Sequence, residues 1–134
     1  MRNQTRVLVT GAGGFIGRHL AKDLRQRGYW VRGADIKYPE YEQSAAHEFL
    51  NLDLRDAGNC LVATEGVDEV YALAANMGGI GFIESHKAEI VRDNTRINIH
   101  TIEAARVSGV KRLLYSSSAC VYPAYLQNRQ DVIP

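Results

Sequence analysis

Three glycines near the start of the chain have the spacing of a phosphate-binding loop: Gly11, Gly14 and Gly17. The β-branched run at 5–10 precedes them and predicts a strand, and a helical pattern follows from Phe15. A glycine turn between a strand and a helix lets the backbone approach a pyrophosphate, and the helix N-terminus then faces the charge of that group. The spacing therefore predicts a dinucleotide-binding loop, although glycines also serve ordinary tight turns.

An aspartate beyond this loop indicates which dinucleotide would bind. Asp35 ends the next expected strand, 29–35, and stands 18 residues after Gly17, close to the roughly 20 expected of an acid that binds a ribose diol. Its carboxylate would repel a 2′-phosphate, which favours NAD over NADP. Lys37 lies near enough in sequence to soften this preference, but it also fits an exposed loop lysine.

A second aspartate, Asp53, follows the expected strand at 48–52. Its side chain has two interpretations, which the sequence leaves open. It caps the next helix, as aspartate often does, or it reaches the adenine of the cofactor.

The remaining pattern supplies the elements that position these residues. Beyond the three strands already named, strands are expected at 68–75 and 111–117 and helices at 15–27 and 87–108, with a glycine-rich interruption at 76–81. Gly28 and Gly109 stand where glycines end helices. Strands alternating with helices predict an α/β fold, a parallel sheet with helices on both faces, and one domain over 1–134.

Composition narrows the possible partners. The chain has 134 residues and a net charge of +1, with 16 Lys and Arg against 15 Asp and Glu, so it lacks the basic field that nucleic-acid binding needs. No apolar run approaches a membrane span and the start does not resemble a signal peptide, so we expect a cytoplasmic protein without membrane contact. Cys60 and Cys120 show no zinc-type spacing to each other or to the four histidines, so no metal site is predicted.

Five parts of the chain carry a family resemblance: 10–17 (Thr-Gly-Ala-Gly-Gly-Phe-Ile-Gly), Asp35, 53–55 (Asp-Leu-Arg), 73–75 (Leu-Ala-Ala) and 116–123 (Ser-Ser-Ser-Ala-Cys-Val-Tyr-Pro). Together they resemble the extended short-chain dehydrogenase/reductases, and among these the NAD-dependent epimerases and dehydratases of nucleotide sugars. The resemblance implies a Rossmann-type doubly wound parallel sheet, of which 1–134 is the N-terminal part, and NAD as cofactor. The residues it implies for cofactor binding are Gly11, Gly14, Phe15, Ile16, Gly17, Asp35, Asp53, Leu54 and Asn94.

Within that family, 75–83 (Ala-Asn-Met-Gly-Gly-Ile-Gly-Phe-Ile) and the cysteine of 118–123 are most similar to the members that epimerise GDP-mannose at C3 and C5. The resemblance implies that NAD takes a hydride from C4 of the sugar and later returns it, and that the transient ketone acidifies the C3 and C5 protons. It implies two catalytic residues: Cys120 in the acid/base pair and Ser118 at the reacting hydroxyl. The substrate-binding residues it implies are Gly78, Ser118, Ala119 and Cys120.

A thiol suits the role given to Cys120, since its free pKa of about 8.5 lets it donate and accept a proton near neutrality. Without the family context, a small buried hydrophobe would be the better interpretation of that residue. Asn76 departs from the pattern, because such epimerases more often carry aspartate there.

The family's catalytic Tyr-x-x-x-Lys is absent from these residues: Tyr115, Tyr122 and Tyr125 are followed four positions later by Ala119, Leu126 and Arg129. We therefore expect an N-terminal fragment that lacks the C-terminal substrate domain and is inactive alone, from a parent that forms a homodimer, as family members commonly do. Two alternatives remain. One is a family member that epimerises and reduces GDP-4-keto-6-deoxymannose with NADPH, against which Asp35 argues. The other is an NAD-binding protein without catalysis.

Overall fold

The structure is a computed structural model and describes residues 4–118 and 121–127. Its centre is a five-stranded sheet in the order β3-β2-β1-β4-β5, and every pair of neighbouring strands is parallel. The strands are β1 Arg6–Thr10, β2 Trp30–Asp35, β3 Glu48–Asn51, β4 Glu69–Ala72 and β5 Arg112–Tyr115. The chain builds outward from β1 to one edge and then from β4 to the other, so the strand order reverses between β1 and β4. The predicted α/β, Rossmann-type fold class is confirmed.

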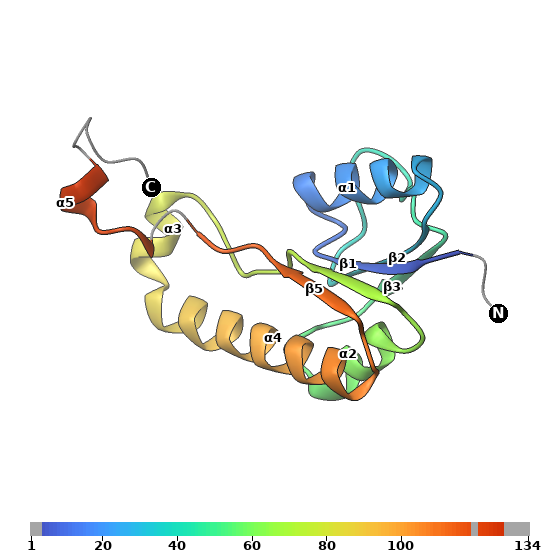
Figure 1. Cartoon of the computed structure of the whole chain (residues 1–134). Coiled ribbons are helices and arrows are strands. Elements are labelled where there is room, and N and C mark those ends of the chain that lie inside the picture. Colours follow the sequence, from blue (N-terminus) through green and yellow to red (C-terminus); the bar gives the residue numbers. More distant parts are fainter. Residues whose placement is uncertain (1–3, 119–120, 128–134) are drawn as a thin grey trace.

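Helices cover both faces of this sheet (Figure 1). Helix α1 (Phe15–Gln26) lies on one face, and α2 (Ala57–Thr64) and α4 (Lys87–Val107) lie together on the other. Two short helices, α3 (Ile80–Ser85) and α5 (Ala124–Gln127), lie beyond the carboxyl ends of β4 and β5. No helix in the described ranges is long and apolar enough to cross a membrane.

Strand β1 joins the two halves of the core. Val7, Leu8 and Val9 are all fully buried. Because successive side chains of a strand point to opposite faces, Val7 and Val9 pack in the cluster that includes Leu24 of α1, whereas Leu8 packs with Ala104 of α4. The unbroken apolar run is typical of a parallel strand that is covered on both sides.

The long helices agree closely with their sequence patterns. Helix α1 was expected at 15–27 and α4 at 87–108, and each ends one residue earlier. Gly28 and Gly109 follow these ends with φ values of +90° and +72°, a backbone conformation that glycine adopts without steric cost. The end signals in the sequence therefore placed both helices correctly.

Strand β4 is shorter than expected, ending at Ala72 instead of residue 75. The cause is the hydroxyl of Thr10, which accepts hydrogen bonds from the backbone N–H groups of Leu73 and Ala74, each at 3.0 Å. A side-chain hydroxyl thus replaces the backbone carbonyl groups of β1 as hydrogen-bond acceptor at this point. Beyond it, the chain leaves the sheet.

No bounds were predicted for the short helices α2, α3 and α5, although one interpretation of Asp53 required a helix after it. The side chain of Asp56 caps α2 by accepting from the backbone N–H of Asn59 at 3.0 Å, so the interpretation of Asp53 as this cap is wrong. Helix α3 begins inside the glycine-rich interruption, with Gly79 at its N-cap. It is too short to show an apolar period, which is why the glycines dominated the prediction there.

Candidate cofactor site

A pocket of about 430 Å³ lies at the carboxyl ends of the strands, where the strand order reverses. Its walls are the segments that follow β1, β2, β3 and β4, closed by side chains of α4. Open α/β sheets bind ligands at this position. The lining residues are Gly11, Gly14, Asp35, Ile36, Lys37, Leu52, Asp53, Leu54, Arg55, Leu73, Ala74, Ala75, Asn76, Met77, Asp93 and Ile97. Five of these were predicted to bind the cofactor: Gly11, Gly14, Asp35, Asp53 and Leu54.

The glycine loop has no room for side chains at Gly11 and Gly17. Gly11 has a φ of +71°, and a Cβ there would lie 3.0 Å from the backbone nitrogen of Ala74. A Cβ on Gly17 would lie 2.1 Å from the carbonyl oxygen of Gly11, so this glycine lets α1 touch the loop. Gly14 is the N-cap of α1 and no side chain caps this helix, which leaves its N-terminal N–H groups for an anion to satisfy.

The carboxylate of Asp35 is fixed over the same loop. Its Oδ2 accepts a hydrogen bond from the backbone N–H of Gly13 at 2.9 Å, and its Oδ1 accepts from the N–H of Lys37 at 3.1 Å. A Cβ on Gly13 would lie 2.1 Å from the carbonyl oxygen of Lys37. Gly13 was not among the predicted site residues, although its place between Gly11 and Gly14 was a usable signal. Asp35 thus lines the pocket in a preset orientation.

Phe15 and Ile16, also predicted to bind the cofactor, open α1 and do not line the pocket described here. Their side chains are 71% and 69% exposed. The ring of Phe15 meets that of His19 edge-on, with centroids 4.8 Å apart. The contact of these two residues with a cofactor stays a prediction.

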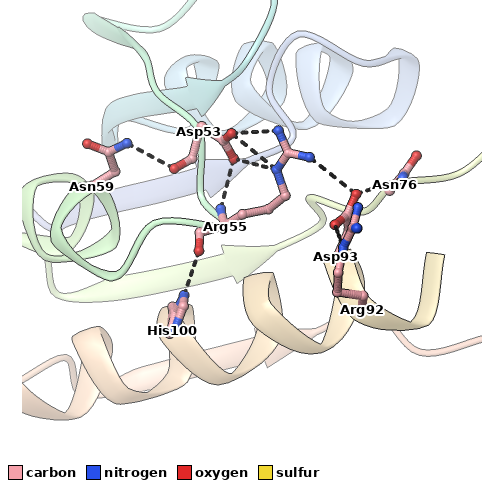
Figure 2. A network of polar contacts seen from close by, with 7 residues as sticks. All are labelled: Asp53, Arg55, Asn59, Asn76, Arg92, Asp93 and His100. Atoms are coloured by element: carbon pink, nitrogen blue, oxygen red, sulfur yellow. Dashed lines mark hydrogen bonds and ion pairs between the residues drawn. The ribbon is translucent and has the colours of Figure 1, made fainter. Parts of the chain in front are cut away.

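A polar network joins four residues of the pocket lining: Asp53, Arg55, Asn76 and Asp93 (Figure 2). The guanidinium of Arg55 donates to Asp53 through Nη2 at 2.7 Å and through Nε at 3.0 Å, and its Nη1 donates to Asp93 at 3.2 Å. The same carboxylate oxygen of Asp93 accepts from Nδ2 of Asn76 at 3.2 Å, while its other oxygen accepts from Nε of Arg92 at 2.9 Å. Asp53 lines the pocket, and both oxygens of its carboxylate accept hydrogen bonds from Arg55. Its contact with adenine stays a prediction.

The neighbouring arginines favour the ionised form of both carboxyl groups. The hydrogen bond from Arg55 lowers the pKa of Asp53, and the hydrogen bond from Arg92 is the main cause that lowers the pKa of Asp93, with Arg55 adding to it. Burial acts in the opposite direction in both and is outweighed. The sequence did not predict three residues of this network as site residues: Arg55, Asp93 and Asn76. An ion pair between residues 38 positions apart leaves no local pattern in the sequence.

Asn94 acts through the backbone of the segment that follows β4. Its Oδ1 accepts from the backbone N–H of Asn76 at 2.6 Å, and its Nδ2 donates to the carbonyl oxygen of Asn76 at 3.1 Å. Asn94 does not line the pocket itself. It holds a wall of the pocket in place, and its direct contact with the cofactor stays a prediction.

The predicted substrate residues lie further out. A Cβ on Gly78 would lie 2.6 Å from the ring of Phe82, so a neighbouring side chain already fills that space. Ser118 follows β5, is exposed, and its carbonyl oxygen accepts from the N–H of Val121 at 3.2 Å. Ala119 and Cys120 lie outside the described residues, so their predicted roles are untested.

Comparison with known proteins identifies the family. Residues 7–133 match the Epimerase family, described as the NAD dependent epimerase/dehydratase family. The chain belongs to this family. GDP-mannose 3,5-epimerase 1 of Oryza sativa subsp. japonica is 48% identical over 129 residues, which are 95% of this chain and 34% of that protein. GDP-L-fucose synthase of Escherichia coli (strain K12) is 32% identical over 121 residues, 90% of this chain and 35% of that one.

A solved epimerase structure has a similar fold. A UDP-glucose-4-epimerase from Stenotrophomonas maltophila, with bound NAD and formylated UDP-arabinopyranose, superposes with a TM-score of 0.81 at 26% identity, covering 96% of this chain and 41% of that chain. The chain spans about a third of the length of the curated relatives it matches. The predicted family is confirmed, and NAD is the family's cofactor, as predicted.

The pocket fits such a dinucleotide in its own right. Gly11, Gly13 and Gly17 stand where a Cβ would collide with backbone, and this close packing brings the backbone of the loop to the pocket. The N-terminus of α1 adds a site for an anion, and the carboxylate of Asp35 supplies an acceptor for hydroxyl groups at the end of β2.

Proposed function

We propose that this chain forms the NAD-binding part of a nucleotide-sugar epimerase that acts on GDP-mannose at C3 and C5. The observation that carries the proposal is the Asp35 carboxylate, fixed over a glycine loop inside a pocket at the switch point of the sheet. The likeness to the rice GDP-mannose 3,5-epimerase, which extends over 95% of this chain, supports this choice of substrate.

Different residues of the pocket would bind different parts of the dinucleotide. Gly11 and Gly14, with the N-terminus of α1, would hold the pyrophosphate, because backbone N–H groups and the helix dipole both favour negative charge there. Asp35 would accept hydrogen bonds from the hydroxyl groups of the adenosine ribose. The same carboxylate disfavours a 2′-phosphate, because bringing two like charges into contact costs on the order of several kcal/mol of binding free energy.

When bound, NAD supplies a reversible hydride acceptor for C4 of the sugar. The part of this chain proposed for the proton chemistry is the segment after β5. The hydroxyl of Ser118 would hold the reacting sugar hydroxyl, and the thiol of Cys120 would remove or replace the proton at C3 or C5. Thiols transfer protons near neutral pH because their pKa is about 8.5.

A second function has one observation in its favour, the 32% identity to the E. coli GDP-L-fucose synthase. That alternative would use NADPH in the interpretation given above, and the position of Asp35 speaks against a 2′-phosphate in this pocket. A non-catalytic NAD-binding protein is the remaining alternative. The proposed function differs from both alternatives in that only it exchanges the protons at C3 and C5 of GDP-mannose with solvent.

The test is to incubate GDP-mannose in heavy water with the protein expressed from its whole reading frame. Deuterium at C3 and C5 of the recovered nucleotide sugar, with no net consumption of NAD, is the expected result. Protein that is folded and holds NAD but incorporates no deuterium would contradict the assigned substrate and leave the cofactor site intact.

The two cysteines give this test a matched pair of variants. Cys120→Ser is expected to lower the exchange rate by about a hundredfold or more, as removal of an acid/base group does. Cys60→Ser makes the same chemical change in the core, where Sγ of Cys60 donates to the carbonyl oxygen of Leu54 at 3.2 Å, a bond that a serine hydroxyl can keep. Equal rates in the two variants would remove Cys120 from the proposed chemistry.

A further inference from the structure

Arg55 joins two walls of the pocket that come from different parts of the sequence (Figure 2). One wall follows β3 and includes Asp53 and Leu54. The other follows β4 and includes Asn76 and Met77. The spacing of these walls determines the shape of the space that lies between them and the carboxylate of Asp35 at the end of β2.

The connection is a continuous chain of hydrogen bonds. Arg55 holds Asp53 at two points, through Nη2 at 2.7 Å and Nε at 3.0 Å, and extends Nη1 to Oδ2 of Asp93 at 3.2 Å. That same oxygen accepts from Nδ2 of Asn76, also at 3.2 Å. A planar guanidinium with several donors can make both contacts at once, which a lysine ammonium does with much less directional control.

The chain is anchored to the rigid part of the fold. Asp93 is 4% exposed and belongs to α4, a helix of 21 residues that packs on α2 below the sheet. His100, two turns further along α4, donates from Nδ1 to the carbonyl oxygen of Arg55 at 2.9 Å. On the other side, Asn94 holds both backbone groups of Asn76. Both walls are therefore fixed relative to one helix.

We propose that Arg55 is a positioning residue: by linking Asp53 to Asp93 it fixes the spacing of the two walls and sets how tightly the adenosine half of NAD is bound. The inference rests on the proposed cofactor site. Arg55 affects the affinity for NAD by orienting this wall. Its loss would therefore move the wall without removing any group assigned to the ribose or the pyrophosphate.

Arg92 provides the matched control. It donates from Nε to Oδ1 of the same Asp93 carboxylate at 2.9 Å, yet it is exposed on α4 and lines neither wall. Arg55→Ala and Arg92→Ala therefore each remove one ion pair from Asp93, and only the first breaks the bridge. Asp93→Asn keeps the shape of the bridge but weakens both pairs.

The experiment measures dissociation constants for NAD and for AMP, together with melting temperatures, on the protein from its whole reading frame. Arg55→Ala is expected to raise the dissociation constants of NAD and AMP by the same factor, about tenfold, which corresponds to about 1.4 kcal/mol of binding free energy. Arg55→Lys is expected to recover part of this loss, and Arg92→Ala to stay within about twofold of wild type.

Each outcome decides a different claim. Equal affinities in Arg55→Ala and Arg92→Ala, whatever their melting temperatures, would overturn the positioning role. Weaker binding of NAD with unchanged binding of AMP would also overturn it, because the effect would then lie outside the adenosine half. Folded wild-type protein that binds no NAD would instead overturn the proposed cofactor site.

Discussion

The carboxylate of Asp35, at the end of β2, accepts a hydrogen bond from the backbone N–H of Gly13 across 2.9 Å. The residue assigned to the ribose and the loop assigned to the pyrophosphate are thus joined before any ligand arrives. A ligand that enters the pocket meets an acceptor already oriented, so little side-chain entropy remains to be lost on binding.

This relationship predicts a change of cofactor preference in Asp35→Ser. Removing the carboxylate takes away both the acceptor for the ribose hydroxyls and the repulsion of a 2′-phosphate, so the ratio of NAD to NADP affinity should fall by about tenfold or more. Calorimetric titration with each dinucleotide measures the ratio. Glu40→Gln, an exposed carboxylate in the following loop, is the control and should leave the ratio unchanged.

Gly13→Ala should damage the same site by sterics. The new Cβ would lie 2.1 Å from the carbonyl oxygen of Lys37, a backbone atom, so the glycine loop or the end of β2 must move. We expect NAD affinity to fall by about tenfold. Gly81→Ala meets nothing within 4 Å and is the matched control. Unchanged affinity in Gly13→Ala would show that the loop does not contact the dinucleotide.

Thr10→Val tests the hydrogen bonds that end β4. The substitution keeps the size of a fully buried side chain but removes the acceptor for two backbone N–H groups, so the free energy of unfolding should fall by about 1–3 kcal/mol. Urea denaturation measures this loss. Thr10→Ser, which keeps the hydroxyl, should lose clearly less, and an equal loss in both variants would point to packing instead.

Stability should fall in acid because of Asp53 and Asp93. Hydrogen bonds from arginines lower the pKa of both groups in the folded protein, so their contribution is present above the ordinary carboxyl pKa of about 4. It is lost as the pH falls through their lowered folded values. Unfolding curves between neutral pH and about pH 3 should show this decline, and Asp93→Asn should make it shallower. Glu103→Gln, which breaks an exposed pair with Arg106, should change it less.

Cys60 should resist alkylation in the native protein. Burial raises the pKa of its thiol, and Sγ donates to the carbonyl oxygen of Leu54, so little reactive thiolate is available. Mass analysis after treatment with iodoacetamide should show Cys60 modified only when denaturant is added. Rapid modification in folded protein would contradict the burial of this side chain.

The sequence predicted those features that local pattern determines. The apolar run of β1, the glycine loop and the two long helices with their terminal glycines all depend on neighbouring residues, and each was placed to within one or two positions. Asp35 was found because its distance from the glycine loop reflects one helix and one strand of ordinary length.

The features that were missed depend on tertiary contact. The side chain of Thr10 shortens β4 from a neighbouring strand, and Arg55 reaches Asp93 only because α4 packs below β4. Gly13 is required by the approach of Lys37 from the next strand end. The contacts of Thr10 and Arg55 leave no periodic or spaced signal in the sequence, whereas Gly13 could have been found from its place between Gly11 and Gly14.

The cofactor site is tested by a calorimetric titration of cofactor-free protein, expressed from its whole reading frame, with NAD and then with NADP. We predict one NAD site per chain, with NADP bound about tenfold more weakly or worse. Folded protein that binds neither dinucleotide, or that binds NADP more tightly than NAD, would contradict it.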